Sequence, residues 1–207
     1  MSIQKSYNDW SETYDTAVNR TRDLDEAAMQ KTLGHRRFVS IVEIGCGTGK
    51  NTALLSKVGK RVHAIDFSEG MIQKAKEKLN AANVQFSAAD ITKRWPVPDQ
   101  SANLVTCNLV LEHIEDLTFV FAEASRVLQK GGQLFVSELH PFRQYQGVQA
   151  RFEAGKDTIQ IDAFVHHISD FLNAANAVGL TLENLRELWH KEDDGKPPRL
   201  LTLLFEK

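Results

Sequence analysis

The chain has 207 residues, of which 42% are hydrophobic and 25% are charged, and its formal net charge is −2. This composition is typical of one globular domain, and the charge excludes the strong positive field used to bind nucleic acids or anionic membranes. The two cysteines, Cys46 and Cys107, cannot form a disulfide framework. There is no apolar run near the roughly 18 residues of a membrane span, and the N-terminus lacks a signal-peptide core. We predict a cytoplasmic monomer or homodimer without nucleic-acid or membrane partners.

Residues 1–37 are polar, with aromatic and leucine side chains spaced unevenly through charged sequence. This spacing predicts short amphipathic helices that form a cap or lid over a larger body. From residue 38 onward, short apolar segments alternate with helical patterns. That alternation is typical of a parallel sheet covered by helices on both faces.

The pattern predicts strands at about 38–44, 61–65, 84–88, 102–107, 133–137, 181–188 and 199–205, and helices at about 50–58, 68–78, 118–129 and 169–178. Residues 139–168 break the alternation, and we interpret them as a substrate-side insertion. We therefore predict a single α/β domain over residues 1–207, with a Rossmann-like, doubly wound, seven-stranded, mostly parallel sheet and an antiparallel last strand. Within it, residues 38–138 are the predicted cofactor-binding core and residues 169–207 a C-terminal helix and strand pair.

The strongest motif is a glycine loop, Gly45-Cys46-Gly47-Thr48-Gly49, between the first predicted strand and the first predicted helix. Alternating glycines let a ligand approach main-chain atoms that any Cβ would block. The spacing differs from the dinucleotide fingerprint, whose third glycine would fall at Lys50. Asp66 ends the second predicted strand, where it can accept hydrogen bonds from a ribose, and Asp90 ends the third. Each acid alone fits a turn, but the two beside a glycine loop favour a nucleotide site.

These motifs resemble those of the class I S-adenosylmethionine-dependent methyltransferases, in particular the small-molecule branch that includes the ubiquinone/menaquinone-type enzymes. The resemblance extends over about residues 38–138 and is carried, in the family's order, by segments 42–49, 62–71, 86–91, 95–105, 108–114 and 128–134. It implies that S-adenosylmethionine is the cofactor and S-adenosylhomocysteine the product. One departure is Asn103, where the family usually has an aspartate that does not contact the cofactor.

The resemblance also implies a set of cofactor contacts along the carboxyl ends of the strands. The contacts implied for the methionyl end are Gly45, Cys46 and Gly47, supported by Glu43, and the backbone carbonyl of Asn108. Asp66 would hold the ribose, Phe67 and Met71 would flank the nucleoside, and Asp90 and Ile91 would contact the adenine. Tyr14 would close over the cofactor.

The acceptor is expected to be a small molecule. Residues 108–111 read Asn-Leu-Val-Leu in place of the Asn/Asp-Pro-Pro-aromatic motif of the amino-methylating branch, so methylation of bases or protein amides is not expected. We favour O-methylation of a carboxylate or of a hydroxyl or phenol. His140 follows a strand's carboxyl end and is the candidate catalytic base, with packing before Pro141 as the alternative. The candidate substrate-binding residues are Tyr7, Trp10, Arg143, which can instead pair with surface acids, Tyr145 and His167.

Other functions remain alternatives. A metal site from Glu138, His140 and His166 or His167 has no diagnostic spacing, so we predict none. A nicotinamide-dependent oxidoreductase would use a similar sheet, but Lys50 and Asp90 disfavour it. A non-catalytic cofactor-binding protein is the third alternative, because a fold does not establish an activity.

Overall fold

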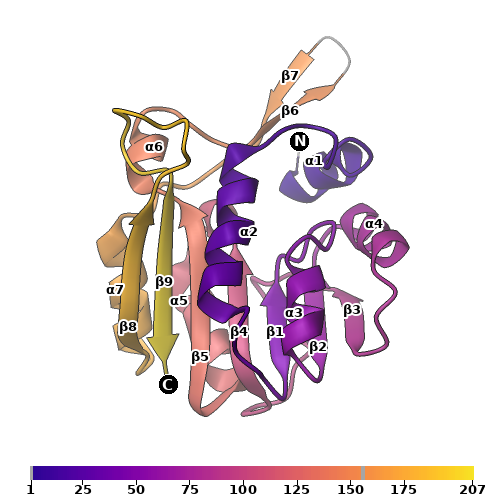
Figure 1. Ribbon diagram of the computed structural model, residues 1–207, viewed down its shortest axis with the longest axis vertical. Helices are drawn as coiled ribbons and strands as arrows, with labels where there is room; N and C mark the ends of the chain where they lie inside the picture. The colour runs from indigo at the N-terminus through magenta and orange to yellow at the C-terminus, as the bar shows by residue number, and fades with distance from the viewer. Residues whose placement is uncertain (1, 155–156) are drawn as a thin grey trace.

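The computed structural model describes residues 2–154 and 157–207, and its centre is a seven-stranded sheet (Figure 1). The strand order is β3-β2-β1-β4-β5-β9-β8, where neighbours from β3 to β5 are parallel and β9 is antiparallel to β5 and β8. This arrangement confirms the predicted fold class. The strands are β1 Ile41–Ile44, β2 Val62–Asp66, β3 Val84–Ala88, β4 Ala102–Asn108, β5 Leu128–Leu139, β8 Thr181–Leu188 and β9 Leu200–Glu206.

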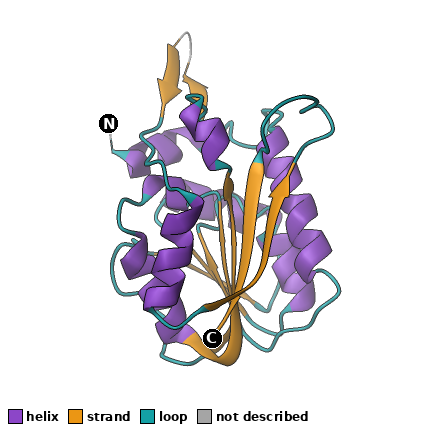
Figure 2. Cartoon of the chain, turned by 90° about the vertical axis from the view of Figure 1, so that its left-hand side faces the viewer, coloured by secondary structure: helices purple, strands orange, loops and turns teal. Residues whose placement is uncertain are grey.

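Helices pack on both faces of the sheet (Figure 2). Successive residues of a strand point to opposite faces, so Leu104 and Val105 of β4 enter different hydrophobic cores, and neither is exposed. Helices α2, α3 and α4 contribute side chains to one face, and α5 and α7 to the other. The helices are α1 Ile3–Trp10, α2 Arg20–Leu33, α3 Thr52–Val58, α4 Glu69–Lys78, α5 Leu117–Val127, α6 Pro141–Tyr145 and α7 Ile168–Ala177, with a 3₁₀ turn, η1, at Leu111–His113. None of the described helices is long and apolar enough to span a membrane.

Side-chain caps fix where the helices begin beside the sheet. Asn19 Oδ1 accepts hydrogen bonds from the backbone N–H groups of Thr21 (3.0 Å) and Arg22 (3.1 Å) at the start of α2. Ser68 Oγ accepts one from Met71 N (3.1 Å) at the start of α4. Such caps satisfy N–H groups that have no partner within the helix.

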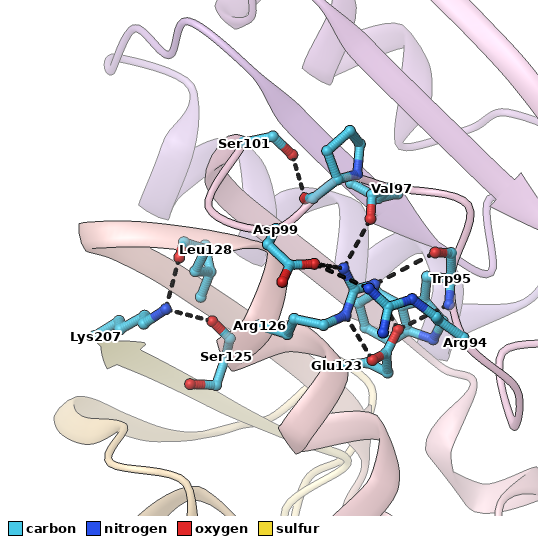
Figure 3. A network of polar contacts seen from close by, with 11 residues as sticks. Arg94, Trp95, Val97, Asp99, Ser101, Glu123, Ser125, Arg126, Leu128 and Lys207 are labelled. Carbon is cyan, nitrogen blue, oxygen red and sulfur yellow. Dashed lines mark hydrogen bonds and ion pairs between the residues drawn. The ribbon is translucent and has the colours of Figure 1, made fainter.

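The connection from β3 to β4 carries Asp90 and Ile91 and is held by a polar network at the end of α5 (Figure 3). Arg126 donates to Val97 O (2.9 Å) and pairs with Glu123 (2.6 Å), which also accepts from Trp95 N (2.8 Å). The guanidinium group thereby ties this irregular connection to a helix, because charge-assisted hydrogen bonds restrain both partners.

The predicted substrate-side insertion contains more regular structure than the sequence pattern indicated. Besides α6, it forms an antiparallel hairpin, β6 Arg151–Ala154 and β7 Asp157–Gln160, which projects beyond the sheet (Figure 1). Phe152 of this hairpin stacks on Trp10 of α1, with ring centroids 5.2 Å apart. The two-stranded ribbon therefore gains stability from packing on α1, which no local pattern reveals.

Candidate active site

Three cavities lie where the parallel strands end. The first, which we call the Asp66 cavity, has a volume of about 340 Å³. Asp66 Oδ2 accepts from Gly47 N and Oδ1 from Ser68 N, both at 2.8 Å, so each oxygen keeps a lone pair for a further donor. Burial raises the pKa of this carboxyl. Gln4 of α1 donates to Phe67 O (2.7 Å) beside the cavity. The lining residues are Ile3, Gln4, Gly45, Asp66, Phe67, Asp90, Ile91, Thr92, Leu109, Val110, His113 and Ile114.

The glycine loop forms the wall between this cavity and the next. Gly45 and Gly47 have φ angles of 71° and 51°, in the left-handed region that favours glycine. A Cβ on Gly45 would lie 2.0 Å from Val110 Cγ2, whereas a Cβ on Gly47 would meet no atom within 4 Å. Gly45 is therefore needed for packing within the protein, and Gly47 leaves open space beside the loop.

The second cavity, the Asp25 cavity, measures about 50 Å³ and contains two buried carboxyls. Asp25 of α2 accepts from Asn108 Nδ2 (2.6 Å) and from Asn51 Nδ2 (2.8 Å), and burial raises its pKa. Glu43 of β1 accepts from the Thr52 hydroxyl (2.6 Å), and burial raises its pKa to about 8. The lining residues are Tyr14, Arg22, Asp25, Glu43, Gly45, Cys46, Gly47, Thr48, Lys50, Asn51, Asn108 and Leu109. The acidic Asp25 and Glu43 and the basic Arg22 and Lys50 together suit the amine and carboxylate of an amino acid.

The third cavity, the arginine cavity, has a volume of about 510 Å³. One of its walls carries Glu112, which is buried and has an Oε2 atom without a hydrogen-bond partner among the described residues. Burial raises the pKa of Glu112 to about 7. The lining residues are Trp10, Tyr14, Ala17, Val18, Asn19, Arg20, Thr21, Arg22, Leu109, Glu112, Leu139, Val148, Gln149, Ala150, Arg151 and Arg199.

The three cavities meet at Leu109, which lines all of them. This residue follows β4 with a φ angle of 55°, and its N–H donates to Ser137 O (2.8 Å). A left-handed leucine costs about 1–2 kcal/mol, and such strain clusters at functional sites. The junction is thus a strained backbone position at the end of a central strand.

Most residues that the resemblance implied as cofactor contacts line these cavities. They are Tyr14, Glu43, Gly45, Cys46, Gly47, Asp66, Phe67, Asp90, Ile91 and Asn108. Met71 is the exception, because its side chain is 1% exposed among the core residues of α4 and lines none of the three cavities. The role of Met71 beside the nucleoside stays a prediction that the lining of these cavities does not support.

The structure places His140 outside the lining of the three cavities, which disfavours its expected catalytic role. Its side chain is 1% exposed, Nδ1 accepts from Phe142 N (3.2 Å), and Nε2 lies 2.9 Å from Glu187 Oε1. Both ring nitrogens therefore have partners, and burial lowers the pKa of the imidazole. His140 caps α6 and does not face a cavity, which agrees with the alternative that this residue packs before Pro141.

Among the predicted substrate-binding residues, Trp10 lines the arginine cavity. Arg143 instead pairs with buried Asp193 (3.0 Å), and neither residue lines that cavity. The Tyr145 hydroxyl meets His167 Nδ1 (2.5 Å) on exposed side chains outside the three cavities. Tyr7 does not line them either, but its hydroxyl lies 2.7 Å from Nε2 of His113, a residue of the Asp66 cavity. Arg143, Tyr145, His167 and Tyr7 therefore line none of the three cavities, and their roles in substrate binding stay predictions.

Sequence reasoning missed Asp25, Glu112 and the arginines of the third cavity. Asp25 carried a signal, because it shares the buried stripe of α2 with Ala28, Met29 and Leu33, where a charged side chain is out of place. Glu112 and Arg199 carried no comparable signal, since they come together from distant parts of the chain.

Comparisons with known proteins agree with this geometry. A family model described as "Methyltransferase domain" matches residues 42–136. The malonyl-[acyl-carrier protein] O-methyltransferase of Yersinia pestis is 30% identical to this chain over 171 residues, which cover 83% of this chain and 60% of that protein. The enzyme of the same name from Hahella chejuensis is 30% identical over 175 residues, which cover 83% of this chain and 59% of that protein. The chain thus spans about three fifths of the length of these relatives.

Solved structures show the same fold. The DhpI–SAH complex superposes with a TM-score of 0.75 at 20% identity, with coverage of 98% of this chain and 94% of that one. An S-adenosylmethionine-dependent methyltransferase from Mesorhizobium loti gives a TM-score of 0.72 at 20% identity, over 90% of this chain and 98% of that one. The fold is therefore shared with these S-adenosylmethionine-dependent methyltransferases. Residues 42–136 form a methyltransferase domain, and the glycine loop, Asp66 and the relatives in sequence agree with a class I enzyme that uses S-adenosylmethionine as its cofactor.

Proposed function

We propose that this protein methylates an oxygen atom of a small molecule bound in the arginine cavity. The observation that carries the proposal is the junction at Leu109, where the arginine cavity opens beside the two cavities lined by the glycine loop and Asp66. The names of the Yersinia pestis and Hahella chejuensis relatives support oxygen as the methylated atom. A methyltransferase mainly has to align the acceptor with the methyl group and exclude water.

The cofactor fits the residues that are present. Open space beside Gly47 admits a ligand against the loop, and Asp66 retains lone pairs for the ribose hydroxyls. Asp25 would face the methionyl amine, while Arg22 and Lys50 suit its carboxylate. When bound, S-adenosylmethionine supplies a methyl group on a sulfonium, which passes to the acceptor oxygen while the sulfur keeps the bonding electron pair and becomes the thioether of S-adenosylhomocysteine.

A hydroxyl acceptor needs a base, whereas a carboxylate does not. Glu112 replaces His140 as our candidate, because its buried Oε2 has no other described partner and its pKa of about 7 lets it take a proton at neutral pH. If the acceptor is a carboxylate, no base is needed and Glu112 would only help to position the acceptor.

We also propose that the protein acts in the cytoplasm on a free small molecule, without a nucleic-acid partner, as a monomer or homodimer. Two buried, unpaired cysteines and the net charge of −2 support this setting.

The first test is calorimetric titration with S-adenosylmethionine, S-adenosylhomocysteine and NADH, using wild type and Asp66→Ala. We expect micromolar binding of both sulfur compounds, at least about 100-fold weaker in the variant, because the carboxylate loses hydrogen bonds to a buried ribose. Methyl transfer from labelled S-adenosylmethionine to a metabolite extract follows. NADH binding alone would move the protein to the oxidoreductases, and binding without transfer to any extract would support a non-catalytic role.

A further inference from the structure

The arginine cavity is rich in arginine, although the net charge of the chain is negative. Its lining residues include Arg20, Arg22, Arg151 and Arg199, and Glu112 is the acidic residue among them. The formal charge of the whole chain is −2. The positive charge is therefore a local property of this cavity, and a concave wall concentrates the field of such charges.

Asp193 is shared between Arg199 and Arg143. Asp193 accepts from Arg199 Nε (2.7 Å) and Nη2 (2.5 Å), but its Oδ1 also lies 3.0 Å from Arg143 Nη2. One buried carboxylate thus serves two guanidinium groups, and the hydrogen bonds from Arg199 hold the pKa of Asp193 far below its usual range. The pair fixes Arg199, whose Nη1 lies 3.2 Å from the Thr21 hydroxyl in the cavity wall, and leaves one positive charge in excess.

Arg22 and Arg151 form no ion pair with a described carboxylate, although the charge of Arg22 helps to lower the pKa of Asp15 and Asp23. Arg22 stacks over the Tyr14 ring at 4.1 Å and donates to the carbonyls of Tyr14 (2.6 Å) and Ala17 (3.1 Å). Arg151 on the projecting hairpin is exposed, and no ion pair joins it to a described side chain. Arg20 pairs with Glu192 at the surface. Because Arg22 suits the methionyl carboxylate of the cofactor and Arg20 is paired, Arg151 and the excess charge at Arg199 are what the described residues leave for an acceptor.

The remaining wall is apolar. Trp10 and Tyr14 pack edge to face with centroids 4.7 Å apart, and Leu139 is buried at the end of β5. An anionic head and an apolar body together would satisfy both kinds of wall.

We propose that the acceptor is an organic acid, with a carboxylate or phosphate held by Arg199 and Arg151 and an apolar body against Trp10 and Tyr14. This inference rests on the proposed function, since it names the class of molecule that the arginine cavity takes. Guanidinium groups bind both anions through paired N–H donors, so the two acids are distinguished by experiment.

The test uses three probes with one body: phenylacetate, phenyl phosphate and the neutral phenylacetamide. Ligand-observed NMR titrations are run on the full chain with and without S-adenosylhomocysteine, after its binding has been measured. We expect at least one acid to bind about tenfold or more tightly than the amide. Arg151→Gln, at an exposed side chain that forms no ion pair with the described side chains, and Arg199→Gln should each reduce that preference to about threefold or less. Arg61→Gln, at an exposed arginine just before β2, is the matched control.

The acid with the tighter binding identifies the anionic group. Equal binding of acids and amide, or no binding of either acid, would overturn the proposal, as would an acid preference that survives in both cavity variants. Failure of the proposed function gives a different result, because S-adenosylhomocysteine would then not bind whatever the probes do.

Discussion

Glu138 makes the stability of this protein depend on pH in a direction that can be measured. Its side chain on β5 is 2% exposed, and Oε1 accepts from Val110 N (3.0 Å) and Leu111 N (2.9 Å). These hydrogen bonds hold the segment just after Leu109, where the cavities meet. Burial is the largest cause of a pKa that rises from the ordinary 4.5 to about 8. Replacement by glutamine keeps an acceptor oxygen and removes the ionisation.

The sign follows from the proton count. Below pH 4.5 the carboxyl is protonated in both the folded and unfolded chains, so it imposes no ionisation penalty on folding. Between pH 4.5 and about 8 the unfolded chain loses its proton while the folded protein keeps it, so stability falls as pH rises. Each pKa unit corresponds to about 1.4 kcal/mol, so the whole change is about 5 kcal/mol, of which about 4 kcal/mol falls between pH 5 and 9.

The assay is urea unfolding of wild type and Glu138→Gln at pH 5, 7 and 9. The variant's free energy of unfolding should gain about 4 kcal/mol relative to wild type across that range, a large part of a typical domain's stability. Glu115→Gln, at an exposed side chain, should follow wild type throughout. An equal difference between Glu138→Gln and wild type at pH 5 and pH 9 would refute the assignment of a buried, protonated carboxyl.

Three further predictions concern the site. Gly47→Ala should weaken S-adenosylhomocysteine binding at least about tenfold, measured by calorimetry, and lower the free energy of unfolding by about 1–2 kcal/mol, measured in urea. Gly45→Ala should destabilise the protein more, because its Cβ would clash with Val110, and equal losses of stability in the two variants would contradict this difference. Glu112→Gln should lower kcat for a hydroxyl acceptor about 100-fold and remove the rise in rate with pH near 7, while the affinity for the cofactor stays the same. An unchanged pH profile would exclude Glu112 as the base. His140→Ala should lower the free energy of unfolding by about 1–2 kcal/mol because α6 loses its cap, while kcat stays within about twofold of wild type. A large loss of kcat without a loss of stability would support a catalytic role for His140.

The sequence alone predicted the sheet and the cofactor side of the site because both depend on local features. Strand and helix periodicity is set by nearest neighbours, and the glycine loop with Asp66 lies within one strand-helix-strand unit. Gly45 and Gly47 illustrate this, since their positive φ angles require glycine wherever the rest of the chain lies.

The acceptor side depended on tertiary contacts. His140 follows a strand in the right position for a base, but the Glu187 carboxylate from β8 and the Phe142 N–H occupy its ring nitrogens. Arg143 likewise pairs with Asp193, whose position depends on the turn before β9. No local pattern encodes which of several arginines is paired, because an ion pair joins residues far apart in the chain.

The sequence therefore determined the fold and brought the predicted nucleoside contacts to one cavity, since both follow from backbone geometry and short-range spacing. The arginine cavity was decided only by the tertiary structure, where α1, α2, η1, the β6 strand and the start of β9 each contribute one part of the wall. Its charge arises from which guanidinium groups find a carboxylate partner in three dimensions, and that balance exists only once distant segments are packed together.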